Sequence, residues 1–480
     1  MGAADIDVDV AILGAGTAGM SAYREVRKYT DRIALIDGGP LGTTCARVGC
    51  MPSKLLIAAA DSAHSAEAAD LFGVHAGPVN VDGRAVMARV KRERDRFVGF
   101  VEDAVEDFED AHLLREHAMF EDDHRLCLAD GRIVTAARTI IATGSRAHVP
   151  PPFAALGDLT ITNDDLFYRD DLPKSVVVFG GGVIGLELGQ ALSRLGVRVR
   201  LFGKDGAVGP LTDPVLKAYA AQTFSREFPA VLDGEAVPHR DGDEVVVDWT
   251  DGNGETGEER FDLLLAATGR RANLEGLKLE NTSLTLDERG IPVFDHLSLQ
   301  AGKSSIFLAG DVDGDLPLLH EAADDGRVAG ENAARYPEVF RRQRRTPLGI
   351  MFTDPGIAMA GATHRELTAR GVHFETGAVS YEDQGRARVI GKNVGVLHVY
   401  GEQETGRLLG AEMIGPGAEH IMHLIAWTID TGATVTEAIG RPFYHPVLEE
   451  GLRTALRGLN AKLGFSANPP MRCIDCGPGG

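Results

Sequence analysis

Two segments, residues 8–37 and 175–206, repeat one order of apolar and polar positions. Each opens with an apolar run, VDVAIL or SVVVF, and passes through a cluster of glycines into a helix-like stretch. Each then closes on a second apolar run, IALI or VRVRLF. This order predicts a strand, a tight turn, a helix and a second strand. Its repetition within one chain predicts two dinucleotide-binding sheets.

The rest of the chain falls into three further patterns. Residues 110–150 alternate short strand-like runs with turns, and the proline-rich VPPPF at 149–153 reads as a connection to the second unit. From Thr346 onward, the strand-like runs IGKNVGVLHVY and LLGAEMIG precede the helix-like runs GAEHIMHLIAWTIDTG and PVLEEGLRTALRGL. Strands followed by helices predict an α+β domain. The final MRCIDCGPGG reads as a mobile tail.

Length, charge and cysteine content narrow the class of protein. The 480 residues are enough for roughly three domains of about 150 residues each. A formal net charge of −21 argues against nucleic acid and anionic membranes as partners, because both are bound through excess Lys and Arg. The N-terminus carries no basic leader. The sequence contains no run of about 18 apolar residues, so we expect no membrane span. Five cysteines are too few for a secreted disulfide framework, so we expect a reducing cytoplasm.

Glycines at the turn of the first segment form a GxGxxG motif made of Gly14, Gly16 and Gly19. Such glycines permit a tight turn and the close approach of a pyrophosphate to a helix N-terminus. Asp37 closes the second strand, where a carboxylate accepts a hydrogen bond from a ribose hydroxyl. Strand, turn, helix and acid together predict a nucleotide site.

The second segment carries the same glycines but lacks the acid. Its motif is Gly180, Gly182 and Gly185, whereas its second strand ends at Gly203 and Lys204 without a carboxylate. Lys204 and the two arginines of that strand could favour a 2′-phosphate, or these basic residues could simply coat a solvated strand. The two arginines are Arg198 and Arg200. The choice between NAD and NADP therefore stays open.

The loop GTTCARVGCMPSK, residues 42–54, holds Cys45 and Cys50. A structural disulfide, a metal half-site and a redox pair all use this spacing. A zinc site would need two further ligands at similar spacing, and none lies near in sequence, so no resident metal is expected. A chain of this length in a reducing compartment needs no covalent staple. The following residues are helix-like, so unpaired N–H groups and a cation, Arg47 or Lys54, would stabilise a thiolate there, which favours a redox pair.

With these residues in place, the chain resembles the class I pyridine nucleotide-disulfide oxidoreductases, and most of all the dihydrolipoamide dehydrogenases. The resemblance rests on a CxxxxC followed by PSK and on both glycine motifs, and it runs over nearly the whole chain. The further matching motifs are ATGS at 142–145, AATGRR at 266–271, LAGDVDG at 308–314 and HPVLEE at 445–450. It implies an α/β fold with two Rossmann-like dinucleotide-binding domains, for FAD and NAD(P), and a C-terminal α+β dimerisation domain.

The resemblance also implies where the domains begin and end. We expect the FAD-binding domain at 1–150 and again at 274–345, with the NAD(P)-binding domain between them at 151–273. The dimerisation domain is expected at 346–470, followed by a tail at 471–480 that carries CxxC.

The resemblance implies two sets of cofactor-binding residues. Asp311 would reach the ribityl chain of FAD, and Lys54 would lie near the flavin ring and pair with Glu187 of the nicotinamide unit. The set for FAD is Gly14, Gly16, Gly19, Asp37, Thr44, Lys54, Ala118, Thr143, Gly144, Asp311, Leu318, Leu319 and His320. The set for NAD or NADP is Gly180, Gly182, Gly185, Glu187, Gly203, Lys204 and Gly269.

The catalytic roles are implied in the same way. Cys50 would face the flavin, while Cys45 exchanges with a dithiol or disulfide substrate. His445 would be the base, since an unperturbed pKa of about 6.5 suits transfer of a thiol proton near neutrality, and Glu450 would orient its ring. In the family this histidine reaches the cysteines of the other subunit, which implies an obligate homodimer. The implied reaction passes two electrons between a dihydrolipoyl group on a carrier protein, or a small dithiol, and NAD(P)+.

Some residues depart from the family pattern. Arg47 lies where these dehydrogenases usually carry Asn, and it either lowers a thiol pKa, meets an anionic substrate or is a surface side chain. Val183 stands where glutathione reductases carry a gating Tyr, which favours the dihydrolipoamide branch. Cys127 is expected to be a buried strand residue.

The tail supplies an alternative function. Cys473 and Cys476, as CIDC, resemble the C-terminal dithiols of mercuric reductases and large thioredoxin reductases. The chain could then be another disulfide or metal-ion reductase that uses this pair as a relay. A retired flavoprotein serving as a scaffold should have lost Cys45, Cys50 or His445, and the chain keeps all three.

Overall fold

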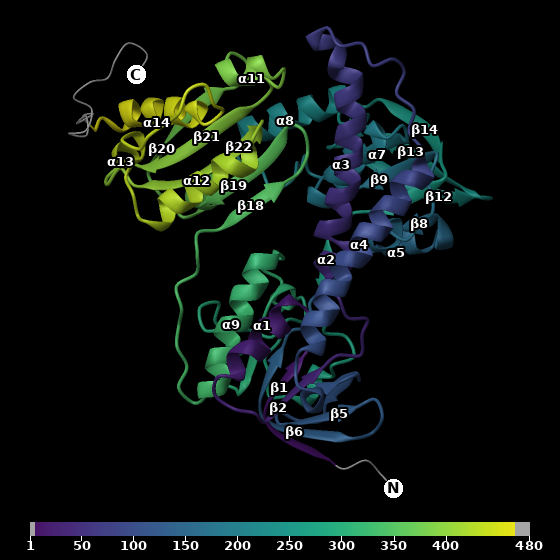
Figure 1. Cartoon of the computed structure of the whole chain (residues 1–480), viewed down its shortest axis with the longest axis vertical. Helices are drawn as coiled ribbons and strands as arrows, with labels where there is room; N and C mark the ends of the chain where they lie inside the picture. The colour runs from purple at the N-terminus through teal and green to yellow at the C-terminus, as the bar shows by residue number, and fades with distance from the viewer. Residues whose placement is uncertain (1–4, 466–480) are drawn as a thin grey trace.

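The computed structural model describes residues 5–465, which are organised by three sheets of five or more strands (Figure 1). A two-stranded ribbon and a separate three-stranded antiparallel sheet accompany them. The predicted α/β class, with two Rossmann-like units and a C-terminal α+β domain, is confirmed. Among the described residues, no helix combines the length and the apolar character needed to cross a membrane.

The first unit is a seven-stranded sheet in the order β3-β2-β1-β6-β5-β4, with β17 paired to the second half of β6. Strands β3, β2, β1, β6 and β17 run parallel, whereas β4, β5 and β6 form an antiparallel meander. The end of β1 is buried on both faces, which explains its continuous apolar run. The strands are β1 (Ile6–Leu13), β2 (Ile33–Ile36), β3 (Leu113–Leu114), β4 (Ala118–Phe120), β5 (Arg125–Leu128), β6 (Ile133–Ile141) and β17 (Ile306–Leu308).

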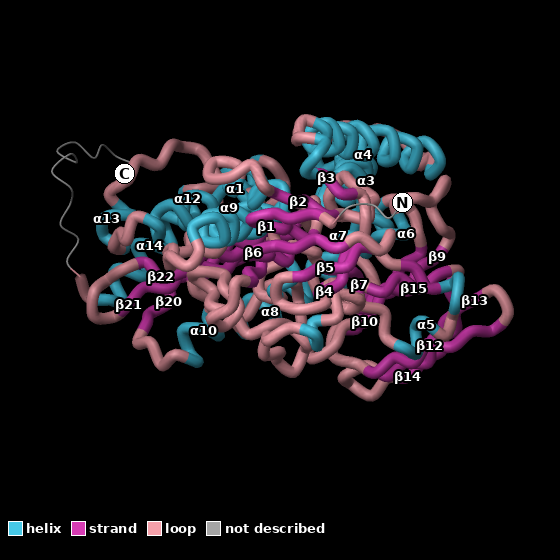
Figure 2. The backbone as a smooth tube through the Cα atoms, turned by 90° about the horizontal axis from the view of Figure 1, so that it is seen from below, coloured by secondary structure: helices cyan, strands magenta, loops and turns pink. Residues whose placement is uncertain are grey.

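Helices α1 (Thr17–Val26) and α9 (Leu319–Arg335) lie side by side on the first sheet, as Figure 1 and Figure 2 both show. Their close approach depends on Gly326, because a Cβ added there would lie 2.2 Å from the carbonyl oxygen of Ala18. The chain therefore returns to its first sheet after residue 300, and the first unit is built from two separate parts of the sequence.

The second unit is an all-parallel sheet in the order β11-β10-β9-β15-β8. All five residues of β9 are buried, as expected for a central strand with both faces covered. Its strands are β8 (Thr160–Ile161), β9 (Ser175–Phe179), β10 (Arg198–Phe202), β11 (Ala230–Val231) and β15 (Leu263–Ala266). Its helices are α5 (Pro151–Ala154), α6 (Asn163–Leu166), α7 (Val183–Arg194) and α8 (Pro214–Glu227). The proline-rich stretch expected as a plain connection thus includes the short helix α5.

An antiparallel sheet of three strands extends from the second unit (Figure 2). Its strands are β12 (Glu235–Asp241), β13 (Glu244–Thr250) and β14 (Thr256–Phe261). The two passages of the chain between the units, β7 (Ser145–Ala147) and β16 (Arg270–Ala272), pair antiparallel with each other.

Three helices connect the two units along one side. Helix α2 (Thr44–Val48) and helix α3 (Cys50–Glu67) are separated only by Gly49, and α4 (Gly83–Glu106) runs beside them (Figure 1). Helix α3 also packs against α7 of the second unit. The expected helix start near Cys50 is confirmed, with Pro52 in the first turn, where a missing N–H costs no hydrogen bond.

The C-terminal domain is a five-stranded antiparallel sheet in the order β18-β19-β22-β21-β20. Its strands are β18 (Leu348–Met351), β19 (Gly356–Gly361), β20 (Phe374–Ser380), β21 (Val396–Glu402) and β22 (Leu408–Gly415). Its helices are α10 (His364–Ala369), α11 (Gly385–Val389), α12 (Ala418–Asp430), α13 (Val435–Ile439) and α14 (Glu450–Leu463). The strand expected from residue 390 begins only at Val396, because Gly391 and Gly395 turn the chain with positive φ values.

Candidate active site

Cys45 and Cys50 lie on either side of the break between α2 and α3. Both are free thiols, Cys45 half-buried and Cys50 exposed. The turn that leads into them is strained, because Thr43 has a φ of +54° that side chains rarely adopt. The Thr43 hydroxyl accepts a hydrogen bond from the N–H of Ala46 at 3.2 Å and so caps α2. The cap and the strained turn together hold the first cysteine at the start of its helix.

The two thiols differ in acidity because one stabilises the other. A hydrogen bond from Cys45 lowers the pKa of Cys50 to about 7. The charge of Lys54 adds to this shift, whereas atoms crowded around the Cys50 sulfur oppose it, although the residue as a whole is exposed. The pKa of Cys45 is raised, first by its hydrogen bond to Cys50 and then by burial. Cys50 is also the first residue of α3, where unpaired N–H groups favour an anion. The pair is therefore arranged to carry one thiolate on Cys50 and one proton on Cys45.

Lys54 and Glu187 form an ion pair one turn beyond the thiols. Lys54 Nζ lies 2.7 Å and 3.0 Å from the two carboxylate oxygens of Glu187, whose side chain is only 3% exposed. Phe352, directly after β18, donates its backbone N–H to Glu187 Oε1 at 2.7 Å, and the Lys54 ammonium lies 4.8 Å from the centre of its ring. A residue of the C-terminal domain thus completes a pair built by the other two units.

The first glycine motif forms a turn with an open side. A Cβ on Gly14 would lie 2.4 Å from the carbonyl oxygen of Ala142, and a Cβ on Gly19 would lie 1.8 Å from that of Gly14. A Cβ on Gly16 would meet nothing within 4 Å. Gly16 therefore borders the space in front of α1, where a pyrophosphate can approach the unpaired N–H groups of the helix.

Asp37 is tied to the same turn. Its two oxygens accept hydrogen bonds from the N–H groups of Ala15 and Gly39, both at 2.6 Å. These contacts fix the carboxylate at the end of β2, beside the glycine motif. Open space over a helix N-terminus and an acid at the strand end fit a dinucleotide such as FAD.

Asp311 is held by a chain of hydrogen bonds that crosses between the units. Ser145 donates its hydroxyl to Asp311 Oδ2 at 2.9 Å. Arg270 donates through Nε to the Ser145 hydroxyl at 2.8 Å and through Nη2 to the Ser145 carbonyl oxygen at 2.7 Å. Ser145 is buried. The β7–β16 ribbon therefore positions Asp311 from the second unit.

The other residues expected at FAD lie on several elements of the first unit and on α2. Thr143 follows Ala142 and donates its hydroxyl to Asn273 at 2.8 Å, and Gly144 follows with a φ of +68°. Leu318 caps α9, so Leu319 and His320 form the first turn of that helix. Ala118 starts β4 directly after His117, whose ring lies against Gly38 beside Asp37. Thr44 is the first residue of α2.

The second glycine motif repeats the first. A Cβ on Gly180 would lie 2.1 Å from the carbonyl oxygen of Ala267, one on Gly185 would lie 1.9 Å from that of Gly180, and one on Gly182 would meet nothing within 4 Å. The turn opens into a cleft of about 750 Å³. The expected residues on its wall are Gly180, Gly182, Gly203, Lys204 and Gly269. Gly185 lies behind the turn, and Glu187 points instead to Lys54.

Three aromatic rings form a wall of this cleft that the sequence analysis missed. Phe153 and Phe179 lie with ring centres 4.6 Å apart, and Phe179 and Phe202 with ring centres 5.5 Å apart. Two of them end the strands SVVVF and VRVRLF, which was the available signal. An aromatic wall offers a flat apolar surface for a base or ring of a ligand.

Arg198 and Arg200 do not line the cleft. Arg200 Nε pairs with Glu259 at 2.6 Å, and Arg198 Nη1 lies 3.5 Å from the same carboxylate. Their guanidinium groups also lie over the rings of Phe261 and Trp249, at 4.5 Å and 4.6 Å. Both arginines therefore fasten the three-stranded sheet to β10, and of the three basic residues only Lys204 faces the cleft.

His445 is paired with Glu450 at the start of α14. Its Nδ1 lies 2.9 Å and 3.1 Å from the two carboxylate oxygens, and the N–H of Val447 also donates to Glu450 at 3.2 Å. Burial would raise the pKa of Glu450, but these hydrogen bonds outweigh it and lower that pKa. The imidazole is 81% exposed. Within one chain α14 lies on the C-terminal sheet, well away from α2 (Figure 1), so His445 and the thiols are not brought together.

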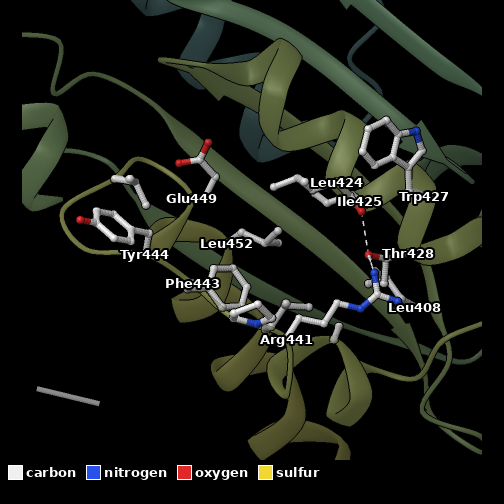
Figure 3. Close-up of a pocket in the computed structure, with 14 residues that line it drawn as sticks. Leu408, Leu424, Ile425, Trp427, Thr428, Arg441, Phe443, Tyr444, Glu449 and Leu452 are labelled. Atoms are coloured by element: carbon white, nitrogen blue, oxygen red, sulfur yellow. Dashed lines mark hydrogen bonds between the residues drawn. The ribbon is translucent and has the colours of Figure 1, made fainter. Parts of the chain in front are cut away.

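An apolar recess of about 430 Å³ lies beside the segment that contains His445, since Tyr444 and Val447 line it (Figure 3). Leu424, Phe443 and Leu452 line it, and Arg441 crosses its floor to donate to the Thr428 hydroxyl at 2.9 Å. Two large side chains at its rim, Trp427 and Tyr444, are 63% and 79% exposed. The recess is suited to apolar contact and offers no reactive pair of groups.

The residues that depart from the family pattern occupy distinct places. Arg47 donates through Nη1 to the carbonyl oxygen of Pro40 at 3.3 Å, and its stem lies beside Gly42, so it folds back onto its own loop. Val183 begins α7 on the wall of the cleft. Cys127 lies in β5 as expected but is only half-buried, because alternate residues of β5 face outward. Cys473 and Cys476 lie outside the described residues.

A buried polar group joins the second unit to the C-terminal sheet, and the sequence analysis missed it as well. This joint cluster consists of Asp213, His398, Tyr400 and Glu412. Asp213 Oδ2 lies 2.7 Å from His398 Nδ1 and accepts from the Tyr400 hydroxyl at 3.1 Å. Glu412, fully buried, accepts from the N–H of Asp213 at 3.0 Å. A glutamate inside the apolar strand LLGAEMIG was the signal.

The joint cluster keeps its acid ionised. Burial would raise the pKa of Asp213, but the hydrogen bond and charge of His398, together with N–H groups at the start of α8, lower it to about 2. The carboxylate also caps α8, since the N–H of Val215 donates to its other oxygen at 2.9 Å. The second unit and the C-terminal sheet are thereby joined at the start of α8.

Comparison with known proteins extends over nearly the whole chain. The family model described as pyridine nucleotide-disulphide oxidoreductase matches residues 8–326, and that of the corresponding dimerisation domain matches residues 348–456. A dihydrolipoyl dehydrogenase of Haloferax volcanii is 30% identical over 464 residues, covering 93% of this chain and 95% of that protein. A mercuric reductase of Streptomyces lividans is 31% identical over 454 residues, covering 92% of this chain and 93% of that protein.

Solved structures agree with the fold. LpdA of Mycobacterium tuberculosis superposes with a TM-score of 0.79 at 25% identity, covering 94% of this chain and 99% of that chain. The flavoprotein disulfide reductase RclA of Escherichia coli superposes with a TM-score of 0.78 at 22% identity, covering 94% and 99%. At that identity the second likeness concerns the fold alone.

Proposed function

The chain belongs to the class I pyridine nucleotide-disulfide oxidoreductases, and we propose that it works as a dihydrolipoyl dehydrogenase. In this proposal it passes two electrons from a dihydrolipoyl group on a carrier protein, or from a small dithiol, to NAD(P)+. The observation that carries the proposal is the unequal thiol pair, with an acidic Cys50 at the head of α3 and a protonated Cys45 in α2. The Lys54–Glu187 pair beside it supports the same conclusion.

FAD, held by the first glycine motif with Asp37 and Asp311, would supply the acceptor for the electron pair that the dithiol gives up. The chain's own thiols perform the exchange. A substrate thiolate attacks Sγ of Cys45 in the oxidised Cys45–Cys50 disulfide, which forms a mixed disulfide and releases Cys50 as a thiolate. Cys50 suits this role because a thiol of low pKa is the better leaving group.

The second half of the exchange needs a base. His445 takes the proton of the second substrate thiol, and the resulting thiolate attacks the substrate sulfur bound to Cys45. This step releases the substrate as a disulfide and leaves Cys45 reduced. Glu450 would hold the ring of His445 in place, as their contact of 2.9 Å suggests.

A second copy of the chain would have to supply His445, because a single chain keeps it away from its own thiols. The proposed homodimer forms through the C-terminal domain, which matches the dimerisation-domain model. Trp427 and Tyr444, exposed beside the apolar recess, are suited to such an interface. We place the enzyme in the cytoplasm, where its thiols meet a reducing environment.

The proposal is tested by adding dihydrolipoamide anaerobically to the purified holoenzyme and following the flavin absorbance. We expect reduction in the wild type and none in Cys45→Ser, with reduction unchanged in the matched control Cys127→Ser. Cys127 lies in β5, a strand that carries none of the proposed site residues. Reduction of Cys45→Ser at the wild-type rate would refute the assigned exchange thiol.

The acidity of Cys50 can be measured directly. The thiolate absorbance of the reduced enzyme near 240 nm should titrate with a midpoint near pH 7 and disappear in Cys50→Ser. Because the hydrogen bond from Cys45 is the largest cause of this low pKa, Cys45→Ala should move the midpoint toward the value of about 8.5 of a free cysteine. An unshifted midpoint in Cys45→Ala would contradict that cause.

A mercuric reductase-like function is the second candidate, favoured by the 31% identity to the Streptomyces lividans enzyme. In that function, Cys473 and Cys476 would relay electrons from the first pair to a metal ion or another disulfide. A variant with both residues changed to Ser separates the two candidates. Unchanged turnover with dihydrolipoamide and with Hg²⁺ would remove the relay, whereas selective loss with Hg²⁺ would favour it.

A further inference from the structure

The second unit differs from the first at the end of its second strand, next to the cleft. In the first unit β2 ends at Ile36, and the next residue, Asp37, places a carboxylate beside the glycine turn. In the second unit β10 ends at Phe202, and the next residue is Gly203, which has no side chain. The place of the acid that accepts from a free 2′-hydroxyl is therefore empty of any acceptor side chain.

The backbone at this place is closely packed and cannot easily take a side chain. A Cβ added to Gly203 would lie 3.0 Å from Leu232 Cδ2 and 3.1 Å from Leu232 Cα. The N–H of Gly203 also donates to the carbonyl oxygen of Val231 at 2.7 Å. The strand end thus packs against Val231 and Leu232 of the same chain. The first side chain after Gly203 that reaches the cleft is therefore that of Lys204.

Lys204 is a cation with a free head group. Its side chain is exposed on the wall of the cleft. No hydrogen bond or ion pair joins it to any residue between 5 and 465, whereas Arg198 and Arg200 are both engaged by Glu259. An ammonium group of this kind binds a phosphate as a point charge.

One carboxylate also borders the cleft. Glu235 begins β12, on the strand after Gly234, and it is the only acid among the described residues that line this cavity. It lies beyond salt-bridge distance of Lys204, so it does not neutralise the ammonium by contact. Glu235 stands on β12, whereas the position that corresponds to Asp37 follows β10. Its effect on the choice between NAD and NADP can therefore be tested separately.

We propose that the cleft contains a subsite for a 2′-phosphate at Lys204, and that the enzyme therefore prefers NADP(H) to NAD(H). The inference rests on the proposed nicotinamide site and deepens it. The positive charge attracts the phosphate, and the missing acid at Gly203 removes both the partner of a free 2′-hydroxyl and the repulsion that a carboxylate would exert on the phosphate.

The test compares adenosine 2′,5′-bisphosphate with adenosine 5′-monophosphate, by calorimetric titration of the holoenzyme at low salt. We expect the bisphosphate to bind roughly tenfold more tightly or better, and the preference to shrink as salt rises. Lys204→Gln should abolish the preference by weakening only the bisphosphate. The matched control Arg200→Gln, which changes a basic residue two positions before Gly203, should keep it.

Equal affinities in the wild type, or a preference that survives in Lys204→Gln, would overturn the subsite. A wild-type preference for the monophosphate that Glu235→Gln abolishes would overturn it too, by showing that Glu235 selects a free hydroxyl. Binding of neither ligand by an enzyme with its full flavin content would overturn the proposed nicotinamide site itself. That result is distinguishable, because equal binding of both ligands leaves the nicotinamide site intact.

Discussion

The two strand–glycine–helix units match at their turns and differ at their strand ends. Gly14 and Gly180 have φ values of +106° and +130°. In each motif, a Cβ added to the third glycine would lie close to the carbonyl oxygen of the first, at 1.8 Å and 1.9 Å. The next residue after the second strand, however, is Asp37 in one unit and Gly203 in the other. The glycines thus form a shared turn, and the two units differ at the strand end beside it, where we propose that the nucleotide is selected.

The two units also differ in how they are held. The first is closed by its own later segment, since α9 crosses α1 at Gly326. The second is fixed from outside by the joint cluster, in which Asp213 meets His398 and Tyr400 of the C-terminal sheet. One unit is therefore held by a helix pair of its own, and the other by a buried ionic contact with the C-terminal sheet.

The largest expected effect comes from filling the turns. Gly185→Ala places a Cβ against the carbonyl oxygen of Gly180, so the turn must open, and we expect nicotinamide nucleotide affinity to fall about 100-fold while FAD is retained. Gly19→Ala should do the reverse and release FAD. Flavin absorbance per chain and calorimetric titration with NADPH measure the two losses.

Gly189→Ala is the control for that pair, because it adds the same methyl group to the same helix. Its Cβ would meet only side chains of Leu201 and Phe228 at 3.6 Å, an ordinary contact. Normal nucleotide binding by Gly185→Ala, or equal damage by Gly189→Ala, would break the claim that the turns are equivalent and close-packed.

A smaller effect is expected at Asp37. In Asp37→Asn a single amide oxygen replaces two acceptors, so the N–H of Ala15 or of Gly39 loses its partner. Such a loss costs about 1–3 kcal/mol, and we expect FAD to bind roughly tenfold more weakly, measured by flavin fluorescence on dilution. Nicotinamide binding should not change. Unaltered FAD affinity would show that the strand end selects no ligand in the first unit.

The smallest effect on nucleotide binding is expected from the joint cluster, whose loss should act on stability and depend on pH. The pKa of Asp213 is lowered to about 2 in the folded chain, against about 3.9 when unfolded. Its contribution is therefore complete above about pH 4 and is lost as the pH falls toward 2. In Asp213→Asn we expect the second unit to be destabilised by up to about 2–3 kcal/mol at neutral pH, with the difference from wild type fading in acid.

Urea unfolding followed by Trp249 fluorescence, in a Trp427→Phe background, reports on that unit. The chain has two tryptophans, and Trp249 lies in β13 beside the second sheet. A destabilisation that stays constant from pH 7 to pH 3 would indicate a packing effect of the substitution and not the loss of an ionised acid.

The elements with a clear period were predictable. The apolar runs at 8–37 and 175–206 led to both Rossmann-like units because buried parallel strands and glycine turns leave a local pattern. The thiol pair was predictable for the same reason, as Cys45 and Cys50 stand in one short loop. What surrounds them was less accessible, since Phe352 acts on Glu187 through a backbone N–H, which carries no residue-type signal.

Contacts between distant segments explain the remaining gaps. Arg198 and Arg200 looked equally able to bind a phosphate, and only the position of Glu259 on β14 shows that they are engaged elsewhere. Asp213 and His398 lie 185 positions apart, so nothing local marks them as partners. In both cases the charge of the side chain was evident from the sequence, whereas its partner was set by how separate sheets pack.

The backbone N–H of Phe352 has a consequence for the order in which the enzyme is made. Lys54 and Glu187 leave the ribosome long before residue 352, so the pair cannot have its last hydrogen-bond donor until the C-terminal segment has been made. A segment made late in synthesis thus completes a contact between residues made earlier. A nascent or truncated protein that ends before β18 would carry its thiols beside an unfinished ion pair, which ties maturation of the redox centre to full-length synthesis.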